Sequence, residues 1–278
     1  MVNEVLRDRF LRGTTLISTA AFALLASTTL ACEGLVMAPG GVVVEVTDGD
    51  TVVLNDGRKV RMIGTQAPKL PLGREDFETW PLAPEAQKAL ADLVLNKTVR
   101  LGFGGEEIDR HERVLAHVFV ETDAGEVWTQ LFMVSAGLAR VYSFPDNRQC
   151  LEPLFAAEAR ARAERLGIWA NPYYSVRAAD RPGELLDRVG HYELVEGRVL
   201  LADRSGSRIF LNFGRFWKED FTAVIEGPAL RLFEAAGLDP LVLEGALVRI
   251  RGWVDDRDGP RIEAVSYTHL TLPTTERV

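Results

Sequence analysis

Between residues 42 and 63, apolar and polar positions alternate in a pattern typical of short β-strands. The strand-like runs Val42–Val46, Thr51–Leu54 and Lys59–Ile63 are separated by the turns Asp48–Asp50 and Asn55–Gly57. Turns that carry glycine next to aspartate or asparagine favour antiparallel neighbours. The sequence therefore predicts a three-stranded meander near the start of the globular part of the chain.

Helical periodicity begins after this meander. Pro84 stands at a first helical position, and Ala86, Leu90, Leu93 and Val94 are spaced for one apolar face. The later segments are expected as two strands, Val99–Phe103 and Val114–Glu121, and two helices, Gln130–Ala136 and Glu152–Leu166. Five strands and three helices in this order suit a closed barrel of the oligonucleotide-binding type with helices packed on it.

A second β-rich unit follows residues 171–187, which are rich in proline, tyrosine and charge and are expected as a linker. Its expected elements are Tyr192–Leu201, Ser207–Phe213, Phe221–Ile225, the helix Ala229–Ala236, Leu247–Val254 and Pro260–Val265. Three strands, a helix and two strands again follow the oligonucleotide-binding order. We therefore expect a mainly β (α+β) protein with two five-stranded barrels, in residues 41–170 and 188–265.

The N-terminal residues 1–31 have the layout of a secretory signal peptide. Arg7, Arg9 and Arg12 precede an apolar run that ends at Ala31, before Cys32. This predicts an exported protein, periplasmic or secreted, whose mature chain starts near Cys32. Two alternatives attach it to the envelope, an uncleaved anchor or lipidation of Cys32. Any membrane association is expected through this segment alone.

The C-terminal residues 266–278 lose all periodicity, so we expect a non-native tail without regular structure. Once the leader is removed, Cys150 and Cys32 are too few for a disulfide framework. A Cys32–Cys150 bridge is one interpretation, and a lone buried thiol at Cys150 is the favoured one.

Composition sets limits on function. With 278 residues, 47% of them apolar and 26% charged, the chain is a globular protein rather than a disordered one. Its net charge is -8, with 16 basic against 21 acidic residues in 41–180 and 12 against 15 in 181–265. Binding of nucleic acid must therefore rely on a local patch. We expect a monomer.

Several blocks of the first unit resemble the staphylococcal nuclease family in order and spacing, over about half the chain. The blocks are Asp48–Val52, Arg61–Lys69, Asp109–Arg113, Gly137–Val141 and Glu158–Trp169. The resemblance implies a barrel of the oligonucleotide-binding type, hydrolysis of phosphodiester bonds in DNA or RNA, and a calcium ion as cofactor.

The resemblance also implies roles for single residues. Asp50 matches a calcium-ligand aspartate, with Asp48 just behind it, and Arg61 and Arg113 match two arginines that clamp the phosphate. Arginine suits this task because its planar fork binds two phosphate oxygens and stays charged.

Tyr142 and Phe144 fall near the region where the family packs a base, and filling the core is their alternative role.

Three positions depart from the family pattern. The second calcium aspartate falls at Gln66, the general-base glutamate falls at Lys69, and the glycine before the second arginine falls at Glu112. Lys69 can pair with Asp50 and so replace the metal, and calcium binding is therefore in doubt. Rescue could instead come from acids in the following loop, which are Glu75, Asp76 and Glu78.

Two functions are consistent with these departures. One is an exported nuclease with attenuated or altered metal dependence. The other is a catalytically silent binding module of the cell envelope.

The second unit interleaves arginines with aromatic residues. They are Arg198, Arg204, Arg208, Arg215, Arg249 and Arg251, with Phe210, Phe213, Phe216, Trp217 and Trp253. Aromatic platforms with arginines are how such barrels hold single strands, although about half of these aromatics must fill a core. A nucleic acid or nucleotide is the expected partner.

Overall fold

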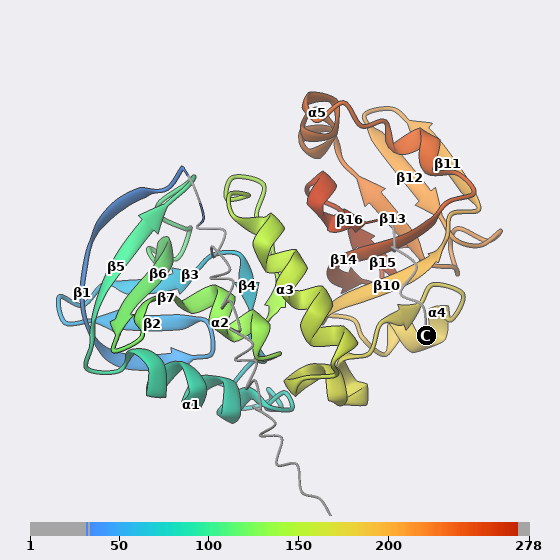
Figure 1. Cartoon of the computed structure of the whole chain (residues 1–278). Coiled ribbons are helices and arrows are strands. Elements are labelled where there is room, and N and C mark those ends of the chain that lie inside the picture. Colours follow the sequence, from blue (N-terminus) through green and yellow to red (C-terminus); the bar gives the residue numbers. More distant parts are fainter. Residues whose placement is uncertain (1–31, 33, 272–278) are drawn as a thin grey trace, which may run out of the picture. The chain divides into compact units, whose positions relative to one another are not determined.

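The computed structural model describes Cys32 and residues 34–271 (Figure 1). The described residues form one compact unit, which holds two separate hydrophobic cores. The predicted signal peptide, residues 1–31, lies outside the described residues. Among the helices of the described part, none is long and apolar enough to cross a membrane.

The first core is enclosed by a barrel. Its strands are β1 (Val36–Asp48), β2 (Thr51–Leu54), β3 (Lys59–Met62), β5 (Thr98–Phe103), β6 (Val114–Thr122) and β7 (Gly125–Trp128). They pair in the order β3-β2-β1-β5-β6-β7, and parallel pairing of β3 with β6 closes a five-stranded barrel. The predicted closed barrel of the oligonucleotide-binding type is therefore confirmed for the first unit.

The barrel differs from the prediction where pattern reading is weakest. β1 begins at Val36 rather than near Gly41, because Pro39 lies at a register shift, where a missing N–H is tolerated. Its first half pairs with β5 and its second half with β2. The strands β4 (Thr65–Gln66) and β8 (Arg140–Val141) pair with each other and were not predicted, since two residues show no alternation.

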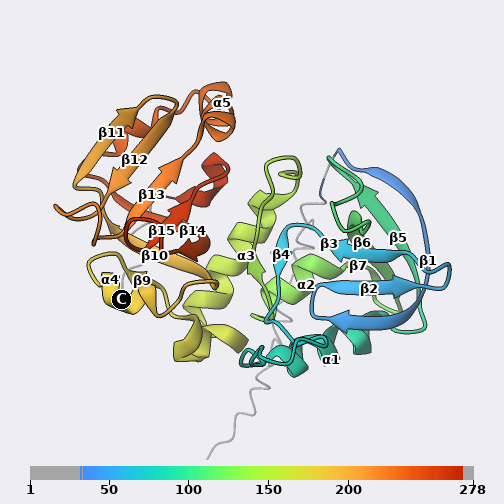
Figure 2. The same cartoon turned by 180° about the vertical axis from the view of Figure 1, so that it is seen from behind.

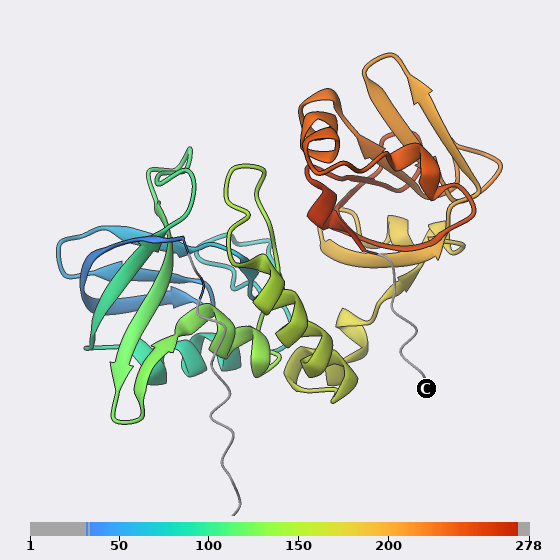
Figure 3. The same cartoon turned by 45° about the horizontal axis from the view of Figure 1, so that its top comes forward.

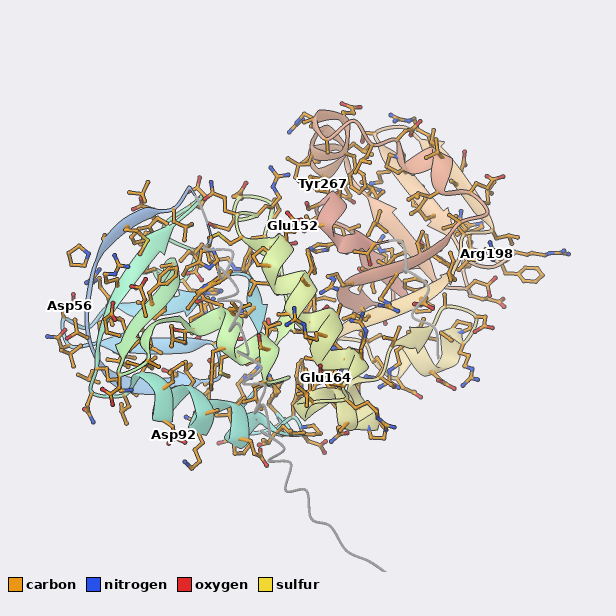
Figure 4. All side chains as sticks on the ribbon, viewed as in Figure 1. Asp56, Asp92, Glu152, Glu164, Arg198 and Tyr267 are labelled. Carbon is orange, nitrogen blue, oxygen red and sulfur yellow. A yellow bond between two sulfur atoms is a disulfide. The ribbon has the colours of Figure 1, made fainter. Side chains whose placement is uncertain are left out.

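Helices cover the barrel. They are α1 (Ala83–Val94), α2 (Thr129–Ser135) and α3 (Leu151–Ala163), and Figure 2 shows α1 alongside the barrel strands. α1 buries Ala86, Leu90 and Val94, as its periodicity predicts. α3 is shorter than the predicted Glu152–Leu166, because Arg165 takes a left-handed φ of 54° and turns the chain before Gly167. Glu152 and Glu164, labelled in Figure 4, mark its two ends.

The second core is formed largely by residues of a second sheet, whose ribbon is drawn in Figure 3. Its strands are β9 (Arg177–Ala178), β10 (Tyr192–Arg198), β11 (Leu201–Ser205), β12 (Arg208–Asn212), β13 (Thr222–Ile225), β14 (Leu247–Asp255) and β15 (Arg261–Glu263), with α5 (Gly227–Ala235) between β13 and β14. They pair in the order β11-β12-β13-β15-β14-β10-β9, and β13 is parallel to β15. The predicted single strand Tyr192–Leu201 is divided into β10 and β11, which pair with β14 and β12 respectively.

Two segments expected outside the domains are built into this sheet. Residues 171–187, which follow η1 (Gly167–Ala170), contain the short helices η2 (Pro172–Tyr174) and α4 (Pro182–Leu186). They also contain β9, which pairs with β10. The expectation that residues 266–278 lack regular structure is wrong for residues 266–271. There, η4 (Tyr267–His269) leads into β16 (Leu270–Thr271), which pairs with β14. A further short helix, η3 (Pro240–Leu243), precedes β14.

A disulfide joins Cys32 to Cys150, across a sequence separation of 118 residues. The favoured expectation of a lone thiol at Cys150 is therefore wrong. Sequence could not decide this, because it does not show that the segment before β1 meets the residue that precedes α3.

Breaking this disulfide should destabilise the protein. Closing a loop of this length reduces the entropy of the unfolded chain, so Cys150→Ser should lower the free energy of unfolding by about 3 to 5 kcal/mol. Urea unfolding of wild type and variant, with and without a dithiol reductant, measures this. The control is Cys32→Ser with Cys150→Ser, whose stability should not respond to the reductant. Equal stability of oxidised and reduced wild type would contradict the prediction.

Candidate functional site

The site begins at the turn between β1 and β2. A Cβ atom on Gly49 would lie 2.6 Å from the Cβ of Ala67 and 2.9 Å from that of Ala86, so only glycine lets these segments approach. This packing places the backbone N–H of Ala67 2.8 Å from Asp50 Oδ2 and leaves Asp50 0% exposed. Asp48 Oδ1 accepts from the Asp50 N–H at 3.0 Å. The sequence thus builds a rigid, buried pair of carboxylates.

Two cations face this pair. Lys69 Nζ lies 3.2 Å from both carboxylate oxygens of Asp50 and 3.5 Å from Asp48 Oδ2. Nη2 of Arg61 lies 3.3 Å from Oδ2 of Asp50. Lys69, Asp48, Asp50 and Arg61 therefore form one cluster of balanced formal charge. The pairing of Lys69 with Asp50, raised by the sequence, is the arrangement found.

The cluster shifts the pKa values of both carboxylates. Burial would raise the pKa of Asp50, but Arg61 and Lys69 outweigh it and lower the pKa to about 2. Burial and the neighbouring Asp50 charge raise the pKa of Asp48 above its usual value, against the opposing effects of Lys69 and Arg61. Asp50 is therefore ionised at neutral pH.

These residues do not fit a calcium ion. Calcium needs several oxygen ligands, whereas an ammonium group contacts both carboxylates here. Gln66 does not compensate, because its amide Nε2 donates to the Ala67 carbonyl at 3.2 Å.

A second group with ligand atoms in mutual reach is Cys32, His117 and Cys150, within 4.8 Å of one another. The disulfide takes up both of its sulfurs. Thiolates, the sulfur ligands that metals prefer, are absent while this bond is intact.

Arg61, the first residue matched to the phosphate clamp, is 3% exposed, and both of its terminal nitrogens already have acceptors. It donates to the carbonyl oxygens of Met62, Asp50 and Thr65, the last at 2.7 Å. A phosphate would have to replace some of these bonds. Arg61 is therefore held as a buried positive charge behind the site.

Arg113, the second matched residue, is better placed to meet a ligand. Its side chain is 31% exposed, and it pairs with Asp109 Oδ2 through Nε at 2.8 Å. Asp109 also accepts from the backbone N–H groups of His111 and Arg113, which fixes the loop. Glu112 takes a left-handed φ of 60° in this loop, which explains why glycine suits this position in the family.

Arg113 opens into a cleft of about 820 Å³. The predicted base-packing residues Tyr142 and Phe144 both line it, with ring centroids 4.7 Å apart at a T-shaped angle. Its basic side chains are Arg61, Lys69, Arg74, Arg110 and Arg113, and its acidic ones are Glu106, Asp109 and Asp146. Asp48 and Asp50 balance Arg61 and Lys69, so the cations that can meet a polyanion in this cleft are Arg74, Arg110 and Arg113. They form the local patch that the net charge of the chain requires for binding a polyanion.

Glu75, Asp76 and Glu78, the candidates for rescue, are exposed, and none lines the cleft. His111, Asn147 and Trp253 do line it, and sequence reasoning gave them no role there. His111 stood in a charged turn between two predicted strands. The sequence could not place Trp253 in this cleft, because Trp253 belongs to the second sheet.

The second sheet contacts the first unit through buried polar groups. Arg251 donates to Glu158 through Nη2 at 2.8 Å and to the Val141 carbonyl through Nη1 at 3.0 Å. Tyr192 donates its hydroxyl to the same carbonyl at 3.1 Å. Arg140 and Glu193 add a second ion pair at 3.7 Å, with both side chains buried.

Comparisons with known proteins agree with this geometry. The staphylococcal nuclease homologue model matches residues 59–171. The thermonuclease of Staphylococcus hyicus is 30% identical over 132 residues, which cover 46% of this chain and 75% of that protein. A probable endonuclease of Phaeosphaeria nodorum is 33% identical over 132 residues, again 46% of this chain but only 43% of that longer protein.

An uncharacterized endonuclease of Haemophilus influenzae is 31% identical over 134 residues, which are 46% of this chain and 65% of that protein. The matched family region ends before the second sheet begins. By the extent of these matches and by its barrel, the chain belongs to the staphylococcal nuclease family.

Proposed function

We propose that this chain is an exported, nuclease-like phosphodiesterase acting on DNA or RNA, with attenuated or altered metal dependence. The names of its relatives, thermonuclease and endonuclease, support the activity class. The observation that carries the altered dependence is the Lys69 ammonium, 3.2 Å from both oxygens of Asp50. A lysine here supplies positive charge where the family resemblance implies a cation.

Hydrolysis of a phosphodiester needs an activated water and positive charge over the non-bridging oxygens. Arg110 and Arg113 line the cleft and supply positive charge. The family's general base is replaced by Lys69, and the groups in the cleft that can accept a proton instead are His111, Glu106 and Asp146. Slow hydrolysis is the expected result.

A catalytically silent binding module of the cell envelope is the second candidate. It is favoured by the neutral cluster around Asp50 and by the pairing of Asp109, an acid of the cleft, with Arg113. Hydrolysis of single-stranded DNA, with and without calcium, separates the two functions.

The second sheet is proposed as another barrel of the oligonucleotide-binding type. Its strand order repeats that of the first barrel, including one parallel pair. Several of its arginines are used internally, since Arg249 pairs with Glu196 and Arg251 with Glu158. A pocket of about 660 Å³, lined by residues that include Phe210, Arg215 and Trp217, supports contact with nucleic acid.

Export is supported by the disulfide. Disulfides persist in oxidising compartments such as the periplasm and the extracellular space. The Cys32 sulfur cannot be disulfide-bonded to Cys150 and carry a lipid at once, so the bond favours an unlipidated Cys32.

The mature protein should start near Cys32 and carry no lipid. Expression of the full chain in a bacterium with a periplasm, followed by intact mass spectrometry with and without reductant, measures the start site and the disulfide. An intact Met1, or a mass increased by a lipid, would contradict the proposal.

Arg113→Ala should weaken the binding of a nucleoside bisphosphate by about 2 kcal/mol in a chelator-containing buffer, because a charge-assisted pair is lost. Calorimetry measures this. Arg100→Ala is the matched control, since Arg100 lies on β5, pairs with Glu126 on β7 and does not line the cleft. Equal affinity of wild type and Arg113→Ala would rule out the phosphate-binding role.

Gln66→Asp combined with Lys69→Glu should create calcium dependence and raise phosphodiesterase activity by about a hundredfold. Barrel, Arg113 and Asp50 are in place, and the change adds a hard ligand and a base while it removes an ammonium. A general base alone contributes about 10²- to 10⁴-fold in other enzymes. The measurements are initial rates on single-stranded DNA and unfolding midpoints across a calcium titration.

Each single mutant is a control, because Gln66→Asp keeps the ammonium and Lys69→Glu lacks the second ligand. Calcium should raise the unfolding midpoint of the double mutant and leave that of the wild type unchanged. If the wild type is already fast and calcium-dependent, the proposed role of Lys69 fails. A folded double mutant that stays inactive would show that the site has diverged beyond these two residues.

A further inference from the structure

Aromatic rings form a continuous row beside the cleft. Phe144, Tyr142, Tyr192 and Trp253 follow one another, with successive centroid distances of 4.7, 5.0 and 5.9 Å. The first two belong to the first unit, and the last two lie on β10 and β14 of the second sheet. The row therefore runs from one unit into the other.

The rings of this row differ in how they meet solvent. Tyr192 is fully buried, and its hydroxyl donates to the Val141 carbonyl. Trp253 is 41% exposed and lines the same cleft as Tyr142 and Phe144. Tyr192 thus serves as a spacer, and Trp253 offers a second aromatic surface to whatever enters the cleft.

Trp253 is held firmly by its neighbours. It lies directly opposite Tyr192 across the antiparallel pair of β10 and β14. Trp80 packs on it with a centroid distance of 6.4 Å. Arg251, two residues earlier on β14 and therefore on the same face, anchors the strand through its buried ion pair with Glu158. A ring fixed in this way loses little freedom when a ligand stacks on it.

The charges around the row suit a polyanion that carries bases. Arg74, Arg110 and Arg113, which lie outside the Asp50 cluster, line the cleft together with Trp253. Positive charge along a groove with aromatic platforms is the arrangement that holds single strands, because their bases are free to stack on side chains. Bases inside a duplex already stack on each other.

We propose that Trp253 of the second sheet is a substrate-binding residue of the nuclease-type cleft, where it stacks on a base of a single-stranded nucleic acid beyond the base at Tyr142. This inference rests on the proposed function and extends it. It makes the second sheet part of the binding site and makes single strands the preferred substrate class.

The test compares Trp253→Leu and Trp253→Phe in the full-length protein. Leucine keeps an apolar side chain but removes the ring, whereas phenylalanine keeps a ring. Trp253→Leu should weaken binding of a single-stranded hexadeoxynucleotide about tenfold, and Trp253→Phe should stay within about threefold of wild type. Phe132→Leu is the control, since Phe132 is comparably exposed at 39% and lies outside the cleft. Unfolding midpoints show whether each variant is folded.

An abasic hexamer separates stacking from charge. Trp253→Leu should bind it as wild type does, whereas Arg113→Ala should weaken both oligomers. Tryptophan fluorescence gives a direct signal, because quenching by the base-containing hexamer should fall in Trp253→Phe.

The outcomes distinguish this inference from the proposed function. If Arg113→Ala weakens hexamer binding but Trp253→Leu does not, the role of Trp253 is overturned and the proposed function stands. Equal loss on the abasic and base-containing oligomers in Trp253→Leu would show a structural role and also overturn it. If the wild type binds neither oligomer, both proposals fail.

Discussion

A buried carboxylate needs a compensating positive charge, and this requirement organises the first unit. Asp50 is fully buried because Gly49 allows α1 and the segment at Ala67 to close over it. Its charge is then balanced by Arg61 and Lys69. In other proteins, removing one partner of such a buried ion pair lowers the free energy of unfolding by about 3 to 5 kcal/mol. The cluster is therefore a structural element as well as a candidate site.

The second sheet depends on a comparable interaction. Glu158 on α3 and Arg251 on β14 are both buried, and each lies next to the backbone of Val141. Val141 belongs to β8, which pairs with β4 and therefore with Gln66 at the edge of the site. The buried ion pair thus links the position of the second sheet to the wall of the cleft, which is why Trp253 can contribute to binding.

Sequence patterns predicted the elements that repeat a period several times. The strands β2, β3, β5 and β6 and the helix α1 lie within a few residues of their predicted places, because each buries one face of a regular element. The pattern failed where only two residues pair, as in β4 and β8, and where a proline sits inside a strand, as in β1. It also failed at residues 266–271, where pairing with β14 supplies order that local periodicity does not show.

The sequence by itself determined which charges are present. It showed that Lys69 and Gln66 stand where the family pattern has acids, and that Arg61, Arg113 and Asp50 are retained. Tertiary structure alone decided how these groups pair, because pairing depends on distances between segments far apart in the chain. It placed the Lys69 ammonium beside Asp50 and joined Cys32 to Cys150. It also directed the donors of Arg61 to hydrogen bonds with buried carbonyl oxygens. It also brought Trp253 to a cleft whose other walls lie more than a hundred residues earlier in the chain, a contact that no local pattern encodes.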